Sequence, residues 1–112
     1  MSDETESDAE WLALLSDFRR HFWAVRVPVF WQVWAQASPR AAADWGMELR
    51  SCVHGLAGVA GLVGHPATGE HARLIERHWH ANDADEETLR RLLDGLADEL
   101  RALAPTEGQA DA

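Results

Sequence analysis

Apolar side chains recur every three or four residues along the first third of the chain, beginning near residue 11. This spacing is typical of an amphipathic helix, because residues three and four apart lie on the same helical face. Pro28 interrupts the pattern, so we expect the helix to kink or restart there. The residues predicted to face the core in this segment are Trp11, Leu15, Phe18, Phe22, Val25, Val29 and Val33.

Two further helical segments follow, each bounded by turn signals. Ser38 is suited to cap a helix and Pro39 to occupy its first position. This helix is therefore predicted over about residues 39–63, and Gly64 before a proline is a typical stop. The segment "ATGEHARLIERHWH", residues 67–80, predicts the next helix.

A last helix is expected after the turn "ANDAD", in which Asp83 or Asp85 can cap it. Helices joined by short polar turns predict an all-α fold: an antiparallel four-helix bundle with a short or kinked additional N-terminal helix. We expect this bundle over residues 8–104, between a disordered acidic N-terminus at 1–7 and a disordered C-terminus at 105–112. The leucines that the last helix is expected to bury are Leu89, Leu92, Leu93, Leu96, Leu100 and Leu103.

Composition and charge narrow the range of functions. The chain has 112 residues, of which 46% are hydrophobic, and this size suits one domain. Its formal net charge is −9 and all ten basic residues are arginine, so nucleic acids and anionic membrane surfaces are poor partners. The longest uncharged apolar run, residues 52–64, is too short for a membrane span, and the acidic start is the reverse of a secretory signal. With the single cysteine Cys52 and hence no internal disulfide, a cytoplasmic location is expected.

The segment "HGLAGVAGLVGH", residues 54–65, has a glycine at every third position of a predicted helix. Each glycine inside a helix costs roughly 0.5–1 kcal/mol relative to alanine. On a helical wheel His54 lies opposite the predicted core stripe, and Gly58 and Gly61 flank it on the outer face. Two explanations stay open: the glycines let another protein's backbone approach His54, or they allow close packing between helices of this chain. The core stripe consists of Trp45, Leu49, Cys52, Leu56, Val59 and Val63.

This segment resembles the signature of histidine phosphotransfer (HPt) domains, His-x-Leu-Lys-Gly-x-Ala-x-x-x-Gly. The segment from Phe22 to Pro28 is similar to the helix that usually precedes the signature, and "ARLIE", ending in Glu76, is similar to the one that follows. The resemblance covers about residues 10–103 and implies a four-helix bundle. In that family the signature histidine carries a phosphoryl group between receiver-domain aspartates of two-component phosphorelays. The residues on signature positions are His54, Leu56, Gly58, Ala60 and Gly64.

The resemblance also implies roles for residues around His54. Glu76 matches the position that accepts a hydrogen bond from Nδ1 in several family members, which leaves Nε2 as the nucleophile. Ala57 stands where the family usually has a lysine that helps to balance the phosphate charge. Arg50, one turn before His54, either contacts the phosphate in place of that lysine or is an ordinary solvated arginine. The expected receiver-docking face consists of Met47, Ala57, Gly58 and Gly61.

A phosphohistidine carrier of this kind is not an enzyme on its own. The expected partners are receiver domains of response regulators, a hybrid histidine kinase, or both. The chain itself is expected to bind no cofactor, because Mg²⁺ is supplied at the partner receiver domain, and to be a monomer. Two alternatives stay open: a non-catalytic HPt-like adaptor that binds and modulates a receiver or kinase, and a generic all-α dimerisation module.

Two further groups of residues carry weaker signals. No metal site is predicted from the remaining histidines of the second half, because no compact ligand set completes four-coordinate geometry: His65, His71, His78 and His80. Several aromatic residues lie off the stripe of the first helix: Trp23, Phe30, Trp31 and Trp34. We favour the interpretation that they enlarge the surface with which the helix contacts the core after Pro28. The alternative is that they form an exposed aromatic patch for a partner.

Overall fold

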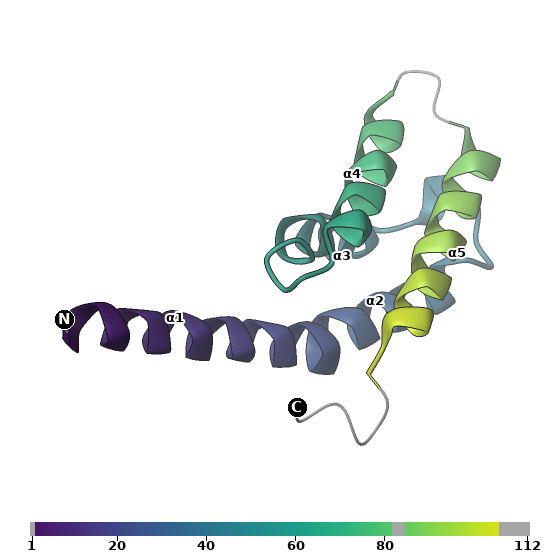
Figure 1. Cartoon of the computed structure of the whole chain (residues 1–112). Helices are drawn as coiled ribbons and strands as arrows, with labels where there is room; N and C mark the ends of the chain where they lie inside the picture. Colours follow the sequence, from purple (N-terminus) through teal and green to yellow (C-terminus); the bar gives the residue numbers. More distant parts are fainter. Residues whose placement is uncertain (1, 82–84, 106–112) are drawn as a thin grey trace.

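The computed structural model describes residues 2–81 and 85–105, and for residues 2–7 it describes the backbone alone. This part of the chain is helical and contains no strand, which confirms the predicted all-α class. None of its helices is long and apolar enough to cross a membrane. In chain order the elements are α1 (Ser2–His21), the π turn η1 (Phe22–Arg26), α2 (Val27–Ala37), the 3₁₀ turn η2 (Ala42–Asp44), α3 (Met47–Val59), α4 (Pro66–His80) and α5 (Glu86–Leu103) (Figure 1).

Helix α1 continues into α2 through the wider turn η1. Pro28 has no N–H, and in a regular α-helix its ring clashes with the carbonyl four residues earlier. In η1 the N–H of Val27 donates to the carbonyl of Phe22, five residues back, so the helix widens just before the proline. The helix therefore does not restart at Pro28, as the sequence allowed; it runs on, and the irregularity takes the form of the π turn η1.

The N-terminal end of the fold differs from the sequence prediction. Helix α1 begins at Ser2, whereas the sequence predicts disorder over residues 1–7. The acidic sequence of this segment suits the N-terminal end of a helix, because carboxylates interact favourably with the helix dipole there. From residue 106 onward, the prediction of a disordered C-terminus falls outside the described residues.

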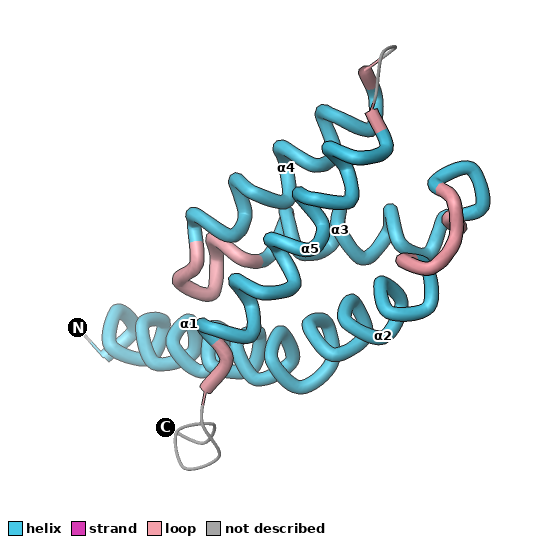
Figure 2. The backbone as a smooth tube through the Cα atoms, turned by 90° about the vertical axis from the view of Figure 1, so that its right-hand side faces the viewer, coloured by secondary structure: helices cyan, strands magenta, loops and turns pink. Residues whose placement is uncertain are grey.

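The buried face of α1 and α2 also differs from the predicted one. Of the seven residues assigned to the core, Phe22 is buried, Leu15 and Val33 are half-buried, and four are exposed: Trp11, Phe18, Val25 and Val29. The π turn adds a residue to the helical repeat, which rotates the face that α2 buries. Helix α1 moreover extends beyond the other helices (Figures 1 and 2). The residues buried instead are Phe22, Val27, Phe30, Trp34 and Ala37.

Helix α3 begins at Met47, later than predicted. Ser38 does not cap this helix but ends α2, and its backbone keeps right-handed helical angles. Arg90 of α5 donates hydrogen bonds to the carbonyls of Ser38 and Arg40. The indole Nε1 of Trp45 also donates to the Arg40 carbonyl, at 3.1 Å. The bonds from Arg90 of a distant helix, together with the local bond from Trp45, hold the segment between α2 and α3 outside both helices.

The turn after α3 confirms Gly64 as the stop signal. One further turn of helical hydrogen bonding follows α3, and Val63 donates to Val59 at 3.2 Å. Gly64 then takes a φ of +98°, a conformation that other residues rarely adopt. The N–H of His65 donates back to the Ala60 carbonyl at 2.8 Å, as in a Schellman motif.

Helix α5 is capped by Asp85, one of the two predicted residues, and the other, Asp83, lies outside the described residues. The Asp85 carboxylate accepts hydrogen bonds from the hydroxyl and the backbone N–H of Thr88, at 2.7 and 3.2 Å. These bonds hold the pKa of Asp85 below its usual range. Along α5 Leu92 is half-buried and Leu103 is exposed, whereas the buried leucines are Leu89, Leu93, Leu96 and Leu100.

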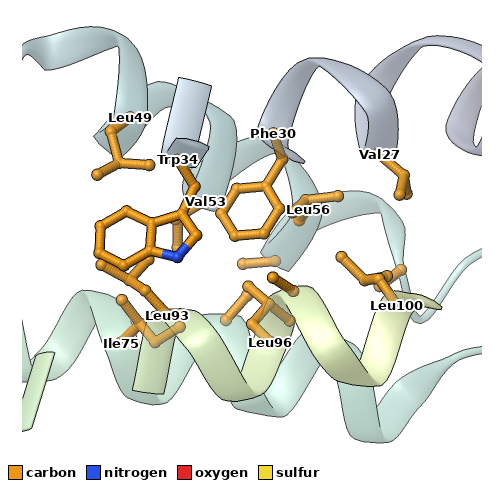
Figure 3. Packing of buried hydrophobic residues seen from close by; sticks show 14 of the residues in the cluster. Val27, Phe30, Trp34, Leu49, Val53, Leu56, Ile75, Leu93, Leu96 and Leu100 are labelled. Carbon is orange, nitrogen blue, oxygen red and sulfur yellow. The ribbon is translucent and has the colours of Figure 1, made fainter. Parts of the chain in front are cut away.

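The core lies among α2, α3, α4 and α5, and Figure 3 shows side chains of α2 pointing toward the leucines of α5. Phe30 and Trp34 are buried in it, and Trp23 and Trp31 pack against it half-buried. The indole Nε1 of Trp34 donates to Oδ1 of Asp94 at 2.8 Å, which satisfies its polar edge inside the fold. The interpretation that these aromatic residues widen the core is therefore confirmed.

Candidate functional site

His54 lies in the middle of α3 with its ring in solvent. Its side chain is 80% exposed, and its Nδ1 lies 2.8 Å from Oε2 of Glu76 on α4. The Glu76 side chain is better covered, with 25% exposed. The structure thus brings together the two residues that were expected to act together, and it places His54 off the buried face.

The contact with Glu76 determines which ring nitrogen carries the proton. An ionised carboxylate only accepts hydrogen bonds, so we assign the proton of the neutral imidazole to Nδ1. The lone pair then belongs to Nε2, on a ring that is open to solvent. A carboxylate behind a metal-bound histidine works in the same way, because it fixes the ring orientation and raises the basicity of the other nitrogen. The arrangement is that of an oriented and accessible nucleophile.

Small residues line the contact between α3 and α4. A Cβ added at Gly69 would already be in van der Waals contact, 3.5 Å from the carbonyl oxygen of Ala57 and 3.7 Å from Cβ of Ala60. Glu76 lies two turns after Gly69 on the same face of α4. The close approach of the two backbones therefore lets a glutamate side chain reach His54 across the helix pair.

Ala57 belongs to this buried contact, so its predicted place on the docking face is wrong. It is 4% exposed. On the helical wheel, the core side of α3 was assigned from its large apolar residues alone. In the structure α4 packs against α3 on the side of Val53, Ala57 and Ala60, so the buried face of α3 is rotated toward these residues. The position at which the resemblance places a lysine therefore points between two helices, away from the solvent around His54.

The other three residues of the expected docking face are exposed. Met47 is 75% exposed, at the first position of α3. A Cβ added at Gly58 or Gly61 would meet no atom of the described residues within 4 Å. Close packing within this chain therefore does not account for these two glycines, and the explanation that a partner backbone approaches there stays as the hypothesis.

Replacing Gly58 with alanine is expected to raise the free energy of unfolding by about 0.5–1 kcal/mol, because the methyl group enters open space and alanine favours the helix. Chemical denaturation followed by circular dichroism measures the change. Gly64→Ala is the matched control and should lose stability, because Gly64 has a positive φ. A Gly58→Ala protein less stable than wild type would mean that this position is covered within the chain.

Arg50 is exposed, and its guanidinium lies over the ring of Trp79 on α4, 5.3 Å from the centroid. Trp79 meets Trp45 edge-on at a centroid distance of 6.2 Å. A cation is attracted to an aromatic face, so Arg50 helps to join α3 to α4. The sequence did not identify this pairing, because it joins two helices whose relative rotation is unknown before folding. A phosphate contact through Arg50 stays a prediction.

Cys52 and His71 are of residue types that can act as nucleophiles or bind metals, but their contacts lie elsewhere in the fold. Partial burial raises the pKa of the Cys52 thiol, so this cysteine is a weak nucleophile. Nε2 of His71 lies 3.1 Å from the Leu92 carbonyl, a contact between α4 and α5. Across the part of the chain that the structure describes, no group of three or more His, Cys, Asp or Glu side chains is placed to hold a metal ion.

Comparisons with protein-family models, with curated proteins and with solved structures found no match. Within the site, the pair of His54 and Glu76 is the arrangement with the most specific chemistry.

Proposed function

We propose that this protein is a histidine phosphotransfer protein, which carries a phosphoryl group on Nε2 of His54 between receiver-domain aspartates of a two-component phosphorelay. The observation that carries the proposal is the exposed His54 ring held through Nδ1 by Glu76. The resemblance to the HPt signature supports it, as does the all-helical fold, in which α2 to α5 share one core. We propose that these four helices form the antiparallel bundle that the resemblance implies. The strip of Met47, Gly58 and Gly61 beside His54 would receive the receiver domain.

In the transfer step, the Nε2 lone pair of His54 attacks the phosphorus of an aspartyl phosphate. The P–O bond to the aspartate breaks, and its electron pair leaves with the aspartate carboxylate. The imidazole then carries the phosphoryl group on Nε2 and its original proton on Nδ1, so the ring is cationic. Glu76 stabilises this cation through the hydrogen bond at Nδ1. Mg²⁺ and the other groups that neutralise charge are expected on the receiver partner.

Phosphorylation by phosphoramidate tests the proposal without a partner protein. Attack by Nε2 on its phosphorus breaks the P–N bond and releases ammonia. We expect wild-type protein to gain the mass of one phosphoryl group, removed by acid but not by base, and His54→Gln to gain none. The control is His80→Gln, which changes another exposed histidine and should leave labelling intact. Equal labelling of His54→Gln and wild type would contradict the proposal.

The non-catalytic adaptor is the second candidate, and one feature of the structure favours it. Ala57 is buried where the family has its lysine, so that lysine's charge is missing beside His54, and the Arg50 guanidinium is engaged with the ring of Trp79. An adaptor would bind a receiver domain equally well with wild-type protein and with His54→Gln, and no phosphoryl group would move to it. A phosphotransfer profile against purified phosphorylated receiver domains distinguishes the two functions.

A further inference from the structure

Helix α1 extends away from the rest of the molecule and carries an uncovered apolar face (Figures 1 and 2). Within the described residues it contacts chiefly η1, which directly follows it. Most of the stability of a helix in a protein comes from packing of its apolar face, so we expect this face of α1 to have a partner. The large residues of this face are the exposed Trp11, Leu14 and Phe18 and the half-buried Leu15.

These four residues are arranged symmetrically about the point between Leu14 and Leu15. Trp11 lies three residues before Leu14, and Phe18 lies three residues after Leu15, near one direction on the helical wheel. An antiparallel second copy with its two-fold axis at this point would place Trp11 of each chain opposite Phe18 of the other. Leu14 would lie opposite Leu15. The face is thus complementary to itself, which a two-fold interface requires.

The charged residues beside this face select the antiparallel direction. At about 100° per residue, Asp8 and Arg19 lie along one edge of the face, and Glu10 and His21 lie along the other. In an antiparallel pair each edge meets the same edge of the second copy. Asp8 then lies near Arg19 of the second copy, and Glu10 lies near His21. A parallel pair would bring Asp8 near Glu10, which places like charges together, and would leave Arg19 beside His21 and away from a carboxylate.

We infer that this chain forms a homodimer in which two α1 helices pack antiparallel through Trp11, Leu14, Leu15 and Phe18. The apolar face supplies the attraction, and the acidic start and basic end of α1 set the direction. The inference departs from the expected monomer and does not depend on the chemistry proposed for His54. The core lies among α2 to α5, so changes on the exposed side of α1 leave it intact.

Light scattering coupled to size-exclusion chromatography of the full chain tests the dimer. We expect wild-type protein to have the mass of two chains, falling to one chain on dilution. Leu14→Glu should raise the dissociation constant at least tenfold, because two carboxylates meet apolar residues at the two-fold axis. Ala13→Glu is the matched control on the exposed opposite side of α1, and it should stay dimeric. Circular dichroism should show both variants folded.

Charge reversal tests the direction of pairing. Arg19→Glu or Asp8→Arg alone should weaken the dimer severalfold, because each places like charges together, and the two changes combined should restore it. A monomer at every concentration, or a dimer unaffected by Leu14→Glu, would overturn the inference. So would a double variant whose dimer is weaker than the dimer of either single variant. A dimer that persists with His54→Gln would show that the assembly is independent of phosphotransfer.

Discussion

Replacing Ala57 with lysine is expected to lower the free energy of unfolding by about 3 kcal/mol. Ala57 is 4% exposed between α3 and α4, where its carbonyl lies close to Gly69. A lysine there overpacks the contact and brings an ammonium group among apolar side chains. The HPt signature alone implies the opposite, since lysine is the usual residue at this position and would be harmless on a surface. Chemical denaturation monitored by circular dichroism measures the loss.

Gly58→Lys is the matched control for this change. It introduces the same side chain one residue later, where a Cβ meets nothing within 4 Å of the described chain. At this exposed position lysine favours the helix over glycine, so the free energy of unfolding should rise by up to about 1 kcal/mol, as for Gly58→Ala. If the two lysine variants are equally stable, Ala57 lies on the surface and the placement of α4 against α3 is wrong.

Replacing Glu76 with glutamine is expected to slow phosphorylation of His54 about 10–100-fold, by analogy with the loss found when carboxylates behind metal-bound histidines are changed. Glutamine still accepts a hydrogen bond from Nδ1, but it lacks the negative charge that stabilises the cationic phosphorylated ring. Glu76 is a positioning residue, because it acts on the phosphoryl group only through His54. The rate of labelling by phosphoramidate measures the effect.

Two further observations separate this role from a structural one. Glu70→Gln changes another α4 glutamate, which pairs with Arg73 at 2.7 Å, and it should leave the rate of labelling unchanged. Imidazole nitrogen NMR should show the Nδ1–H tautomer of His54 in wild type and a mixture of tautomers in Glu76→Gln. Wild-type rates in the Glu76→Gln protein would mean that the contact seen in the structure has no part in the reaction.

The sequence predicted the helices better than the faces that they bury. Pro28 and Gly64 indicated the irregularity between α1 and α2 and the end of the helical turn after α3, because such signals act within one turn of the chain. Pro28 predicts an irregularity but not the rotation at η1, since the apolar residues before the proline keep α-helical spacing. The late start of α3 depends on Arg90, fifty residues away, which holds the preceding segment through its carbonyls.

At the candidate site, too, part of the arrangement was predictable from the sequence and part depended on how the helices pack. The HPt signature anticipated that Glu76 would lie beside His54, a contact between two helices that helical spacing alone does not give. The buried position of Ala57 was missed because a wheel drawn from large apolar residues ignores contacts made by small ones. Gly69 near the start of α4 is the signal that was overlooked, since a glycine in a helix is a place where another helix can approach closely.

The most direct test of the proposed function is to find which atom is phosphorylated. Protein containing isotope-labelled histidine is treated with phosphoramidate, and nitrogen–phosphorus coupling is then measured by NMR. Because Glu76 holds Nδ1 at 2.8 Å, the phosphoryl group is expected on Nε2 of His54 and on no other histidine nitrogen. Phosphorylation at Nδ1 of His54, at another histidine, or at none would contradict the account of His54 as an oriented phosphoryl carrier.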